Sequence, residues 1–152
     1  VTKALRAAIR QIAAVEPDLG ALLAFHEERQ ADVTILLATV PDASRFGAVV
    51  RDADGQVLSF SEKPPVGEIA TNTIDAGIYV LRRSVLRRMP PDTEFSFERQ
   101  LFPQLIAEGA RVFACVAEGR YWRSISSLTD YQQAQVDILE QRVDVAIAGV
   151  QV

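Results

Sequence analysis

The feature that most constrains the fold is a run of apolar and β-branched residues at positions 33–40, which reads Val-Thr-Ile-Leu-Leu-Ala-Thr-Val. Polar residues flank the run, which is far shorter than the ~20 apolar residues that cross a bilayer. A short, nearly continuous apolar run is typical of a strand buried on both faces, in a sheet that helices cover. The run therefore predicts a three-layer fold with a central sheet.

A hairpin signal follows this run. Extended patterns at residues 47–50 and 57–62 lie on either side of Asp54-Gly55. An Asp-Gly pair supplies the positive φ angles that tight hairpin turns need. We therefore expect a mixed sheet that contains at least one antiparallel pair of strands.

Helical patterns alternate with the extended ones. Leu5, Ile9 and Ile12 recur at helical spacing and predict a helix over residues 2–13. The other expected elements are a helix at 18–29 capped by Asp18, strands at 74–81, 111–116 and 121–125, a short helix at 83–89, a helix at 96–108 that is kinked or starts late at Pro103, and a helix from the Ser127 cap to about 142. This alternation predicts the α/β class.

The chain length fits one domain. A chain of 152 residues is long enough to bury a hydrophobic core. Residues 1–142 are expected to form that domain. In residues 143–152 apolar side chains alternate with small or polar ones, which is typical of an edge strand or of the first rung of a β-solenoid.

Composition and charge exclude several classes of protein. A net charge of -4 argues against a nucleic-acid partner, because such binding needs a basic surface. With no membrane-spanning run and no visible signal peptide, we expect a cytoplasmic protein without a membrane partner. The single cysteine, Cys115, cannot form an internal disulfide and is expected to be a core residue rather than a nucleophile. His26, the only histidine, is expected to pack within its helix rather than act as a base.

Four sequence strings carry a family resemblance. They are SEKP at 61–64, TNTIDAGIYV at 71–80, FSFERQLFP at 95–103 and YWRSI at 121–125. In this order and spacing they resemble the second half of the nucleotidyltransferase domain of sugar-1-phosphate nucleotidyltransferases, which has the Rossmann-like fold of the nucleotide-diphospho-sugar transferases. The strings LGALLAFH at 19–26 and RFGAVV at 45–50 are most similar to the mannose-1-phosphate guanylyltransferase branch.

The resemblance implies a reaction and a site. In the family, an oxygen of a sugar 1-phosphate attacks the α-phosphorus of a nucleoside triphosphate, and a nucleotide-sugar and pyrophosphate form. The resemblance implies that Lys63 binds the phosphate and Glu62 accepts hydrogen bonds from sugar hydroxyls. The other implied substrate-binding residues are Asn72, Asp75, Gly77 and Gly47.

Plain structural alternatives exist for each of these residues. Glu62 and Lys63 could be a solvated charged pair, and Gly77 a bulge glycine. The family usually has Asn where Asp75 stands, so Asp75 departs from the pattern and adds negative charge near the phosphate. Replacing Asp75 by Asn is therefore expected to improve sugar-phosphate affinity.

Several family motifs are absent from the sequence. There is no Gly-rich triphosphate loop, and only residues 14–17 stand where a strand ending in Gly-Asp would hold Mg²⁺. The family's Trp-x-Asp reads Trp122-Arg123-Ser124 here, and a hydroxyl is a poor Mg²⁺ ligand beside a carboxylate. We therefore expect an incomplete domain that lacks the nucleotide-binding half, does not bind Mg²⁺ and has no catalytic residues of its own.

Three interpretations remain open at this point. The chain could be an incomplete nucleotidyltransferase domain, either a fragment of a larger polypeptide or a degenerate paralogue. It could instead be a non-catalytic sugar-phosphate-binding or regulatory subunit, or a structural interaction module. An incomplete domain exposes apolar surface, so a homo-oligomer or a partner subunit is expected. The apolar side chains concerned are Leu5, Ile9, Ile12, Leu19 and Leu23.

The Glu-Lys pair generates a first prediction. Replacing Lys63 with Ala should weaken sugar 1-phosphate binding by about 1.5–3 kcal/mol, the usual worth of a charge-assisted hydrogen bond, and leave binding of the free sugar nearly unchanged. Glu62→Ala should show the reverse pattern. Titration calorimetry with both ligands measures the two effects, and a Lys63→Ala variant that binds as the parent does would contradict the assignment.

Overall fold

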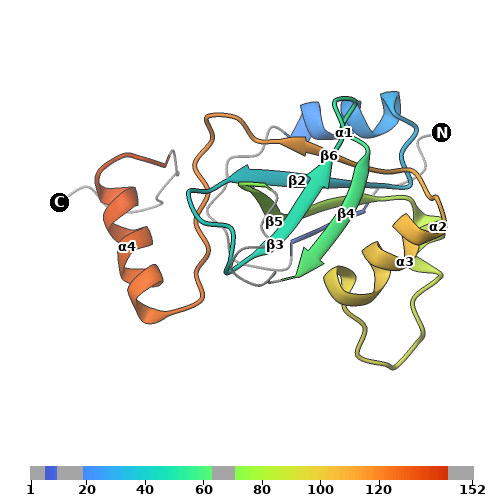
Figure 1. Ribbon diagram of the computed structural model, residues 1–152. Helices are drawn as coiled ribbons and strands as arrows, with labels where there is room; N and C mark the ends of the chain where they lie inside the picture. Colours follow the sequence, from blue (N-terminus) through green and yellow to red (C-terminus); the bar gives the residue numbers. More distant parts are fainter. Residues whose placement is uncertain (1–5, 10–18, 63–70, 144–152) are drawn as a thin grey trace.

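The computed structural model describes residues 6–9, 19–62 and 71–143 (Figure 1). In chain order the elements are β1 (Arg6–Ile9), α1 (Leu19–Glu28), β2 (Val33–Thr39), β3 (Gly47–Arg51), β4 (Val57–Glu62), β5 (Thr73–Leu81), α2 (Arg83–Leu86), the π-helix η1 (Phe97–Leu101), α3 (Phe102–Ala107), β6 (Val112–Val116) and α4 (Leu128–Leu139). The expected strand at 33–40, the hairpin and the helix at 18–29 are confirmed.

One mixed sheet gathers the strands of the described residues. Its order is β4-β3-β5-β2-β6, and β1 pairs with β5 on the edge that β3 also uses. Strand β2 runs antiparallel to β5 and parallel to β6. Residues 33–38 of β2 are all buried, as the apolar run predicts.

Alternate residues of β2 pack into two hydrophobic cores, one on each face of the sheet. Val33, Ile35 and Leu37 face a core formed with η1 and α3. Leu36 and Ala38 face a second core, which includes Leu22 of α1. Helices therefore cover both faces of the sheet, and the expected three-layer α/β class is confirmed (Figure 1).

The β3–β4 hairpin bends across the sheet as far as β6. Gly55 in its turn has a φ of 87°, and its carbonyl accepts a hydrogen bond from the Ala114 amide at 2.7 Å. A Cβ at Gly55 would lie 2.9 Å from the Ala114 carbonyl oxygen, so the turn needs glycine for space as well as for conformation. The contact gives strand β6 a hydrogen-bonding partner on its outer edge.

Two predictions of secondary structure are wrong. Arg6–Ile9 forms a strand rather than part of a helix, pairing antiparallel with β5 from Leu81 to Ile78. The part of the β5 edge that β3 leaves unpaired offers backbone hydrogen bonds to a further strand. These bonds stabilise the strand more than the weak helical pattern stabilises a helix. Residues 121–125 form no strand, because side-chain contacts hold them instead. The other residues of the expected helix at 2–13, the Asp18 cap and residues 144–152 lie outside the described residues.

The other helices follow their local signals with small shifts. The Ser96 hydroxyl accepts from the Arg99 amide at 3.2 Å and caps η1, and α3 then begins one residue before Pro103. The short helix is α2, which ends at Leu86 rather than near residue 89. Ser127 and Asp130 cap α4 reciprocally. Among the described residues, no helix has the length and apolar character needed to cross a membrane.

His26 is buried at the α1–β2 contact. It is 3% exposed, and its Nδ1 lies 2.8 Å from the Thr34 hydroxyl. Its Nε2 has no hydrogen-bond partner within the described part of the chain. Burial, followed by the charge of Arg82, lowers the pKa of His26, although Glu27 and Asp32 oppose the shift. The expected packing role is confirmed.

This burial predicts a pH-dependent stability. Below the ordinary histidine pKa of about 6.5, the unfolded chain takes up a proton that the folded chain excludes. The free energy of unfolding should therefore be highest above that pH and fall as the pH drops through the lowered pKa of His26. Urea unfolding from pH 8 to 5 measures it, and His26→Gln should flatten the slope. Equal slopes in both proteins would contradict the prediction.

Candidate functional site

Three of the expected site residues form one row across the sheet. Glu62 of β4 lies opposite Gly47 of β3. Ala48 pairs with Ile74, so Gly47 lies level with Asp75 of β5. The strand carrying Glu62 is not a direct neighbour of the strand carrying Asp75, because β3 lies between them. With strands about 4.8 Å apart, the row spans about 10 Å.

The remaining expected residues lie around this row. Lys63 follows Glu62 directly and is outside the described residues. Asn72 is exposed just before β5, and its carbonyl accepts from the Val40 amide at 3.0 Å. Asn72 is three residues from Asp75, which is about 10 Å along an extended chain. The fold therefore sets Asn72 apart from the row.

Gly77 forms a bulge in β5. Ile35 pairs with Tyr79 and Leu37 with Asp75, so β5 uses four residues where β2 uses two. The φ of Gly77 is 79°, a conformation that favours glycine. Its amide donates to Asp75 Oδ1 at 2.8 Å. Asp75, Gly77 and Tyr79 alternate along β5 and therefore lie on the same side of the strand.

The Asp75 carboxylate is half-buried and has two donors from its own strand. Besides the Gly77 amide, the Tyr79 hydroxyl donates to Oδ2 at 2.5 Å. An ionised carboxylate accepts hydrogen bonds only, so it suits two facing donors better than an amide does. The departure from the family's Asn thus has an intramolecular explanation.

Tyr79 links the row to η1. Its side chain is 1% exposed, and its hydroxyl also lies 3.4 Å from Glu98 Oε1. Glu98 Oε2 accepts from the Ser96 hydroxyl at 2.7 Å. Burial, followed by the negative charge of Asp75, raises the pKa of Tyr79 far above its usual range, so the phenol stays protonated and donates. π-Helical turns like η1 are frequent at functional sites.

From the sequence, Tyr79 and Glu98 received no role, and Ser96 received only that of a helix cap. Tyr79 shares the two-residue period of Asp75 and Gly77, which was a signal that could have found it. Glu98 lies in the 95–103 string and next to the Ser96 cap. The contact between Glu98 and Tyr79 depends on the tertiary fold, which local sequence patterns do not determine.

The chemistry of this region is rich in acceptors. The carboxylates of Asp75 and Glu98 converge on one hydroxyl, and Glu62 stands in the same row. Such groups suit the hydroxyls of a sugar, whereas a phosphate requires a cation, and Lys63 is the one expected there.

No group of three or more His, Cys, Asp or Glu side chains is arranged to hold a metal within ranges 6–9, 19–62 and 71–143. The resemblance implies that Ser124 stands where the family has a metal-binding Asp. The neighbouring Trp122 has a structural role, since its Nε1 donates to the Ala76 carbonyl at 3.2 Å and its ring packs edge-on against Phe46.

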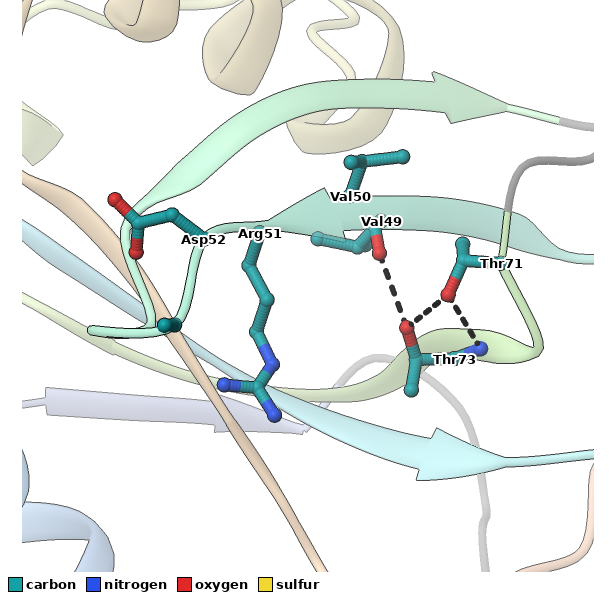
Figure 2. Close-up of a pocket in the computed structure, with 7 residues that line it drawn as sticks. Val49, Val50, Arg51, Asp52, Thr71 and Thr73 are labelled. Atoms are coloured by element: carbon teal, nitrogen blue, oxygen red, sulfur yellow. Dashed lines mark hydrogen bonds between the residues drawn. The ribbon is translucent and has the colours of Figure 1, made fainter.

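A cavity of about 430 Å³ lies where β3 continues past the start of β5 (Figure 2). The Thr73 hydroxyl donates to the Val49 carbonyl at 3.0 Å and lies 2.7 Å from the Thr71 hydroxyl, which therefore donates to it. Both hydroxyl protons are used, so the two threonines offer only lone pairs. Arg51 lines the cavity four residues along β3 from Gly47, and the cavity is distinct from the row.

Comparisons with known proteins identify the family of the chain. A profile of the family described as nucleotidyl transferase matches residues 11–141. A glucose-1-phosphate adenylyltransferase of Desulfitobacterium hafniense is 33% identical over 84% of this chain, and a mannose-1-phosphate guanylyltransferase of Mycobacterium tuberculosis is 38% identical over 80%. A UTP–glucose-1-phosphate uridylyltransferase of Synechocystis is 34% identical over 92% of the chain. These alignments cover 33%, 33% and 37% of the relatives, so the chain spans about one third of their length.

Solved structures give the same fold. HddC from Yersinia pseudotuberculosis matches with a TM-score of 0.66 and 27% identity over 83% of this chain and 52% of its own. A structure described as a putative glucose-1-phosphate thymidylyltransferase from Bacillus anthracis has a TM-score of 0.69, with 89% of this chain and 54% of that chain covered. At 15% identity the second likeness shows the fold alone. The expected nucleotide-diphospho-sugar transferase fold, present in part, is confirmed.

The Tyr79 contact generates the prediction for this site. Tyr79→Phe should lower the free energy of unfolding by about 1.5–3 kcal/mol, because the Asp75 carboxylate loses a buried donor. Urea unfolding in dilute solution measures the loss. Tyr131→Phe is the matched control, since Tyr131 is 53% exposed and should change stability by less than about 0.5 kcal/mol. Equal effects of the two variants would contradict the proposed contact.

Proposed function

The chain belongs to the nucleotidyl transferase family, and on that premise we propose that it binds a sugar 1-phosphate and, taken alone, does not complete nucleotidyl transfer. Its relatives are sugar-1-phosphate nucleotidyltransferases of differing nucleotide specificity. In the proposed complex Lys63 carries the phosphate. Glu62 and Asp75 accept hydrogen bonds from sugar hydroxyls above the backbone of Gly47.

One observation carries this proposal. Glu62, Gly47 and Asp75 come from three strands and yet share one row of the sheet. Groups on neighbouring strands are held more rigidly than groups on loops, which favours binding a small ligand in one orientation. Because Lys63 directly follows Glu62, the phosphate end of the ligand is expected beside β4.

The proposed type of nucleotidyl-transfer reaction is the synthesis of GDP-mannose. The 38% identity to the mannose-1-phosphate guanylyltransferase of Mycobacterium tuberculosis supports it, as do the strings at 19–26 and 45–50. An adenylyltransferase and a uridylyltransferase are 33% and 34% identical, so the sugar and the base need direct measurement.

Catalytic incompleteness rests on the sequence. The Gly-rich loop and the Gly-Asp strand end are missing from these 152 residues, and Ser124 replaces a metal-binding carboxylate. Removing a single donor that stabilises charge at a reacting centre typically costs about 3–4 kcal/mol of barrier, and several such groups are lost together here. We therefore propose that this chain neither binds Mg²⁺ nor turns over by itself.

The alternative is a non-catalytic sugar-phosphate-binding or regulatory subunit that works with an active homologue. The same row of residues supports that function, because binding needs no metal. A purely structural interaction module is the third interpretation, and it requires no ligand at all. Ligand binding separates the first two interpretations from the third.

Calorimetry tests the proposal directly. Mannose 1-phosphate should bind to the chain with the same affinity with and without Mg²⁺, and GTP should give no binding heat. Lys63→Ala should weaken mannose 1-phosphate binding. Arg87→Ala is the matched control, since it removes an exposed cation at the end of α2 and should leave affinity unchanged.

A pyrophosphate-release assay with GTP, mannose 1-phosphate and Mg²⁺ completes the test. We expect no turnover above background. A rate near the ~10 s⁻¹ of ordinary enzymes would contradict catalytic incompleteness. Failure of every sugar 1-phosphate to bind at millimolar concentration would contradict the binding function and leave the structural interpretation.

A further inference from the structure

The β3–β4 hairpin contacts the rest of the sheet near its base and again at its turn. Ala48 pairs with Ile74 of β5, and the Gly55 carbonyl accepts from the Ala114 amide of β6 at 2.7 Å. Between these contacts lies the cavity of about 430 Å³, which we name the hairpin cavity (Figure 2). Its lining residues are Val49, Val50, Arg51, Asp52, Ala53, Thr71 and Thr73. The volume falls within the ~300–1,000 Å³ of sites that bind small molecules.

Arg51 gives the hairpin cavity a positive charge that no neighbour neutralises. Its side chain is half-buried, and it has no hydrogen-bond or ion-pair partner within the described part of the chain. In Figure 2 the side chain extends from the end of β3 into the space that Thr73 also borders. A charge that is taken partly out of water normally has a counter-charge beside it. The guanidinium donors are therefore free to bind an anionic group.

The nearest acidic side chains are engaged elsewhere. Asp52 Oδ1 accepts from the amides of Asp54 and Gln56 at 3.0 and 2.9 Å, and its carboxylate points away from Arg51 in Figure 2. Asp54 Oδ1 lies 3.9 Å from Arg29 Nη1 on α1. The turn of the hairpin thus uses its carboxylates to hold its own backbone and to contact α1, and the charge of Arg51 stays uncompensated.

The two threonines give the cavity a wall of acceptors. Thr71 Oγ1 accepts from the Thr73 amide at 3.1 Å and donates to Thr73 Oγ1, which itself donates to the Val49 carbonyl. Each hydroxyl oxygen keeps one lone pair and has no proton left to offer. This wall suits the hydroxyl groups of a ligand and disfavours a bare anion.

We propose that the hairpin cavity binds a hydroxylated monocarboxylate about the size of a sugar acid, with its carboxylate on Arg51 and a hydroxyl on Thr71 or Thr73. The planar guanidinium matches a carboxylate with two parallel hydrogen bonds. Arg51 is the one cation among the described residues that line the cavity, so a singly charged ligand fits better than a phosphate. The second charge of a phosphate would lie unpaired beside the threonine acceptors.

This site is separate from the one proposed for the sugar 1-phosphate. Arg51 lies four residues along β3 from Gly47, which is about 13 Å in an extended strand. The hairpin cavity shares no lining residue with the Glu62–Gly47–Asp75 row. Binding of a monocarboxylate here therefore does not depend on sugar-phosphate binding, and either property can fail without the other.

NMR titration of the backbone amides with three six-carbon probes tests the ligand class. Gluconate carries both the carboxylate and the hydroxyls, hexanoate only the carboxylate, and glucitol only the hydroxyls. Gluconate should shift the amides of Arg51 and Thr73 saturably, with a dissociation constant on the order of millimolar, as is usual for a ligand with few contacts. Hexanoate, glucitol and inorganic phosphate should each bind at least about fivefold more weakly.

Substitutions test the two walls of the cavity. Arg51→Gln should weaken gluconate binding at least about tenfold, and Arg51→Lys, which keeps the charge and loses the fork, by a smaller factor. Thr71→Val should weaken it about threefold. The matched control is Arg87→Gln, which removes an exposed cation at the end of α2 and should leave affinity within about twofold. A parent-like amide spectrum shows that each variant is folded.

Four results would each overturn the proposal. They are the lack of saturable shifts with gluconate up to about 50 mM, equal affinity for gluconate and either hexanoate or glucitol, parent-like affinity in Arg51→Gln, and an equal loss in Arg87→Gln. Lys63→Ala should leave gluconate affinity unchanged, which distinguishes this site from the sugar-phosphate site. A Lys63→Ala variant that loses both ligands together would show that gluconate occupies the sugar-phosphate site and would also overturn the proposal.

Discussion

Burial of β2 on both faces is the constraint on which the rest of the structure depends. Val33, Ile35 and Leu37 complete one hydrophobic core, while Leu36 and Ala38 complete the other. Strands β5 and β6 pair with its two edges, so the backbone polar groups of this buried segment find partners within the sheet. A shift of pairing by one residue would exchange the two faces and disrupt both cores, and the register is therefore strongly specified.

That fixed register determines the geometry of the candidate site. The pairs Ile35–Tyr79 and Leu37–Asp75 leave β5 two residues longer than its partner, and the excess is taken up at Gly77. The bulge in turn allows Asp75 to accept from the Gly77 amide and the Tyr79 hydroxyl. An Asp at this position thus stabilises the strand that carries it, at the cost of adding negative charge where a phosphate is expected.

Local signals predicted the elements whose stability is local. The β2 run, the Asp54-Gly55 turn and the Ser96 and Ser127 caps all act within a few residues of themselves. The secondary structure predicted for β1 and for residues 121–125 was wrong, because distant partners determine the conformation of both segments. The partner of β1 is the open edge of β5, and the partner of residues 121–125 is Asp137. Whether Glu62, Gly47 and Asp75 lie in one row depends on the order of the strands in the sheet. A hairpin followed by a third strand leaves open which hairpin strand that third strand joins, and here it joins β3.

The same distinction explains why α4 presents its apolar side outward, where Leu128 and Leu139 are exposed. Hydrogen bonds from Tyr121, together with those from Gln133 and Arg123, lower the pKa of Asp137, so the carboxylate stays ionised although it is buried. Breaking such a buried ionic contact is costly, because one charge would be left without a partner. Rotation of α4 about its axis would break it. A buried polar contact that fixes the rotation of a helix also fixes which side remains free, and in this chain the free side is the apolar one.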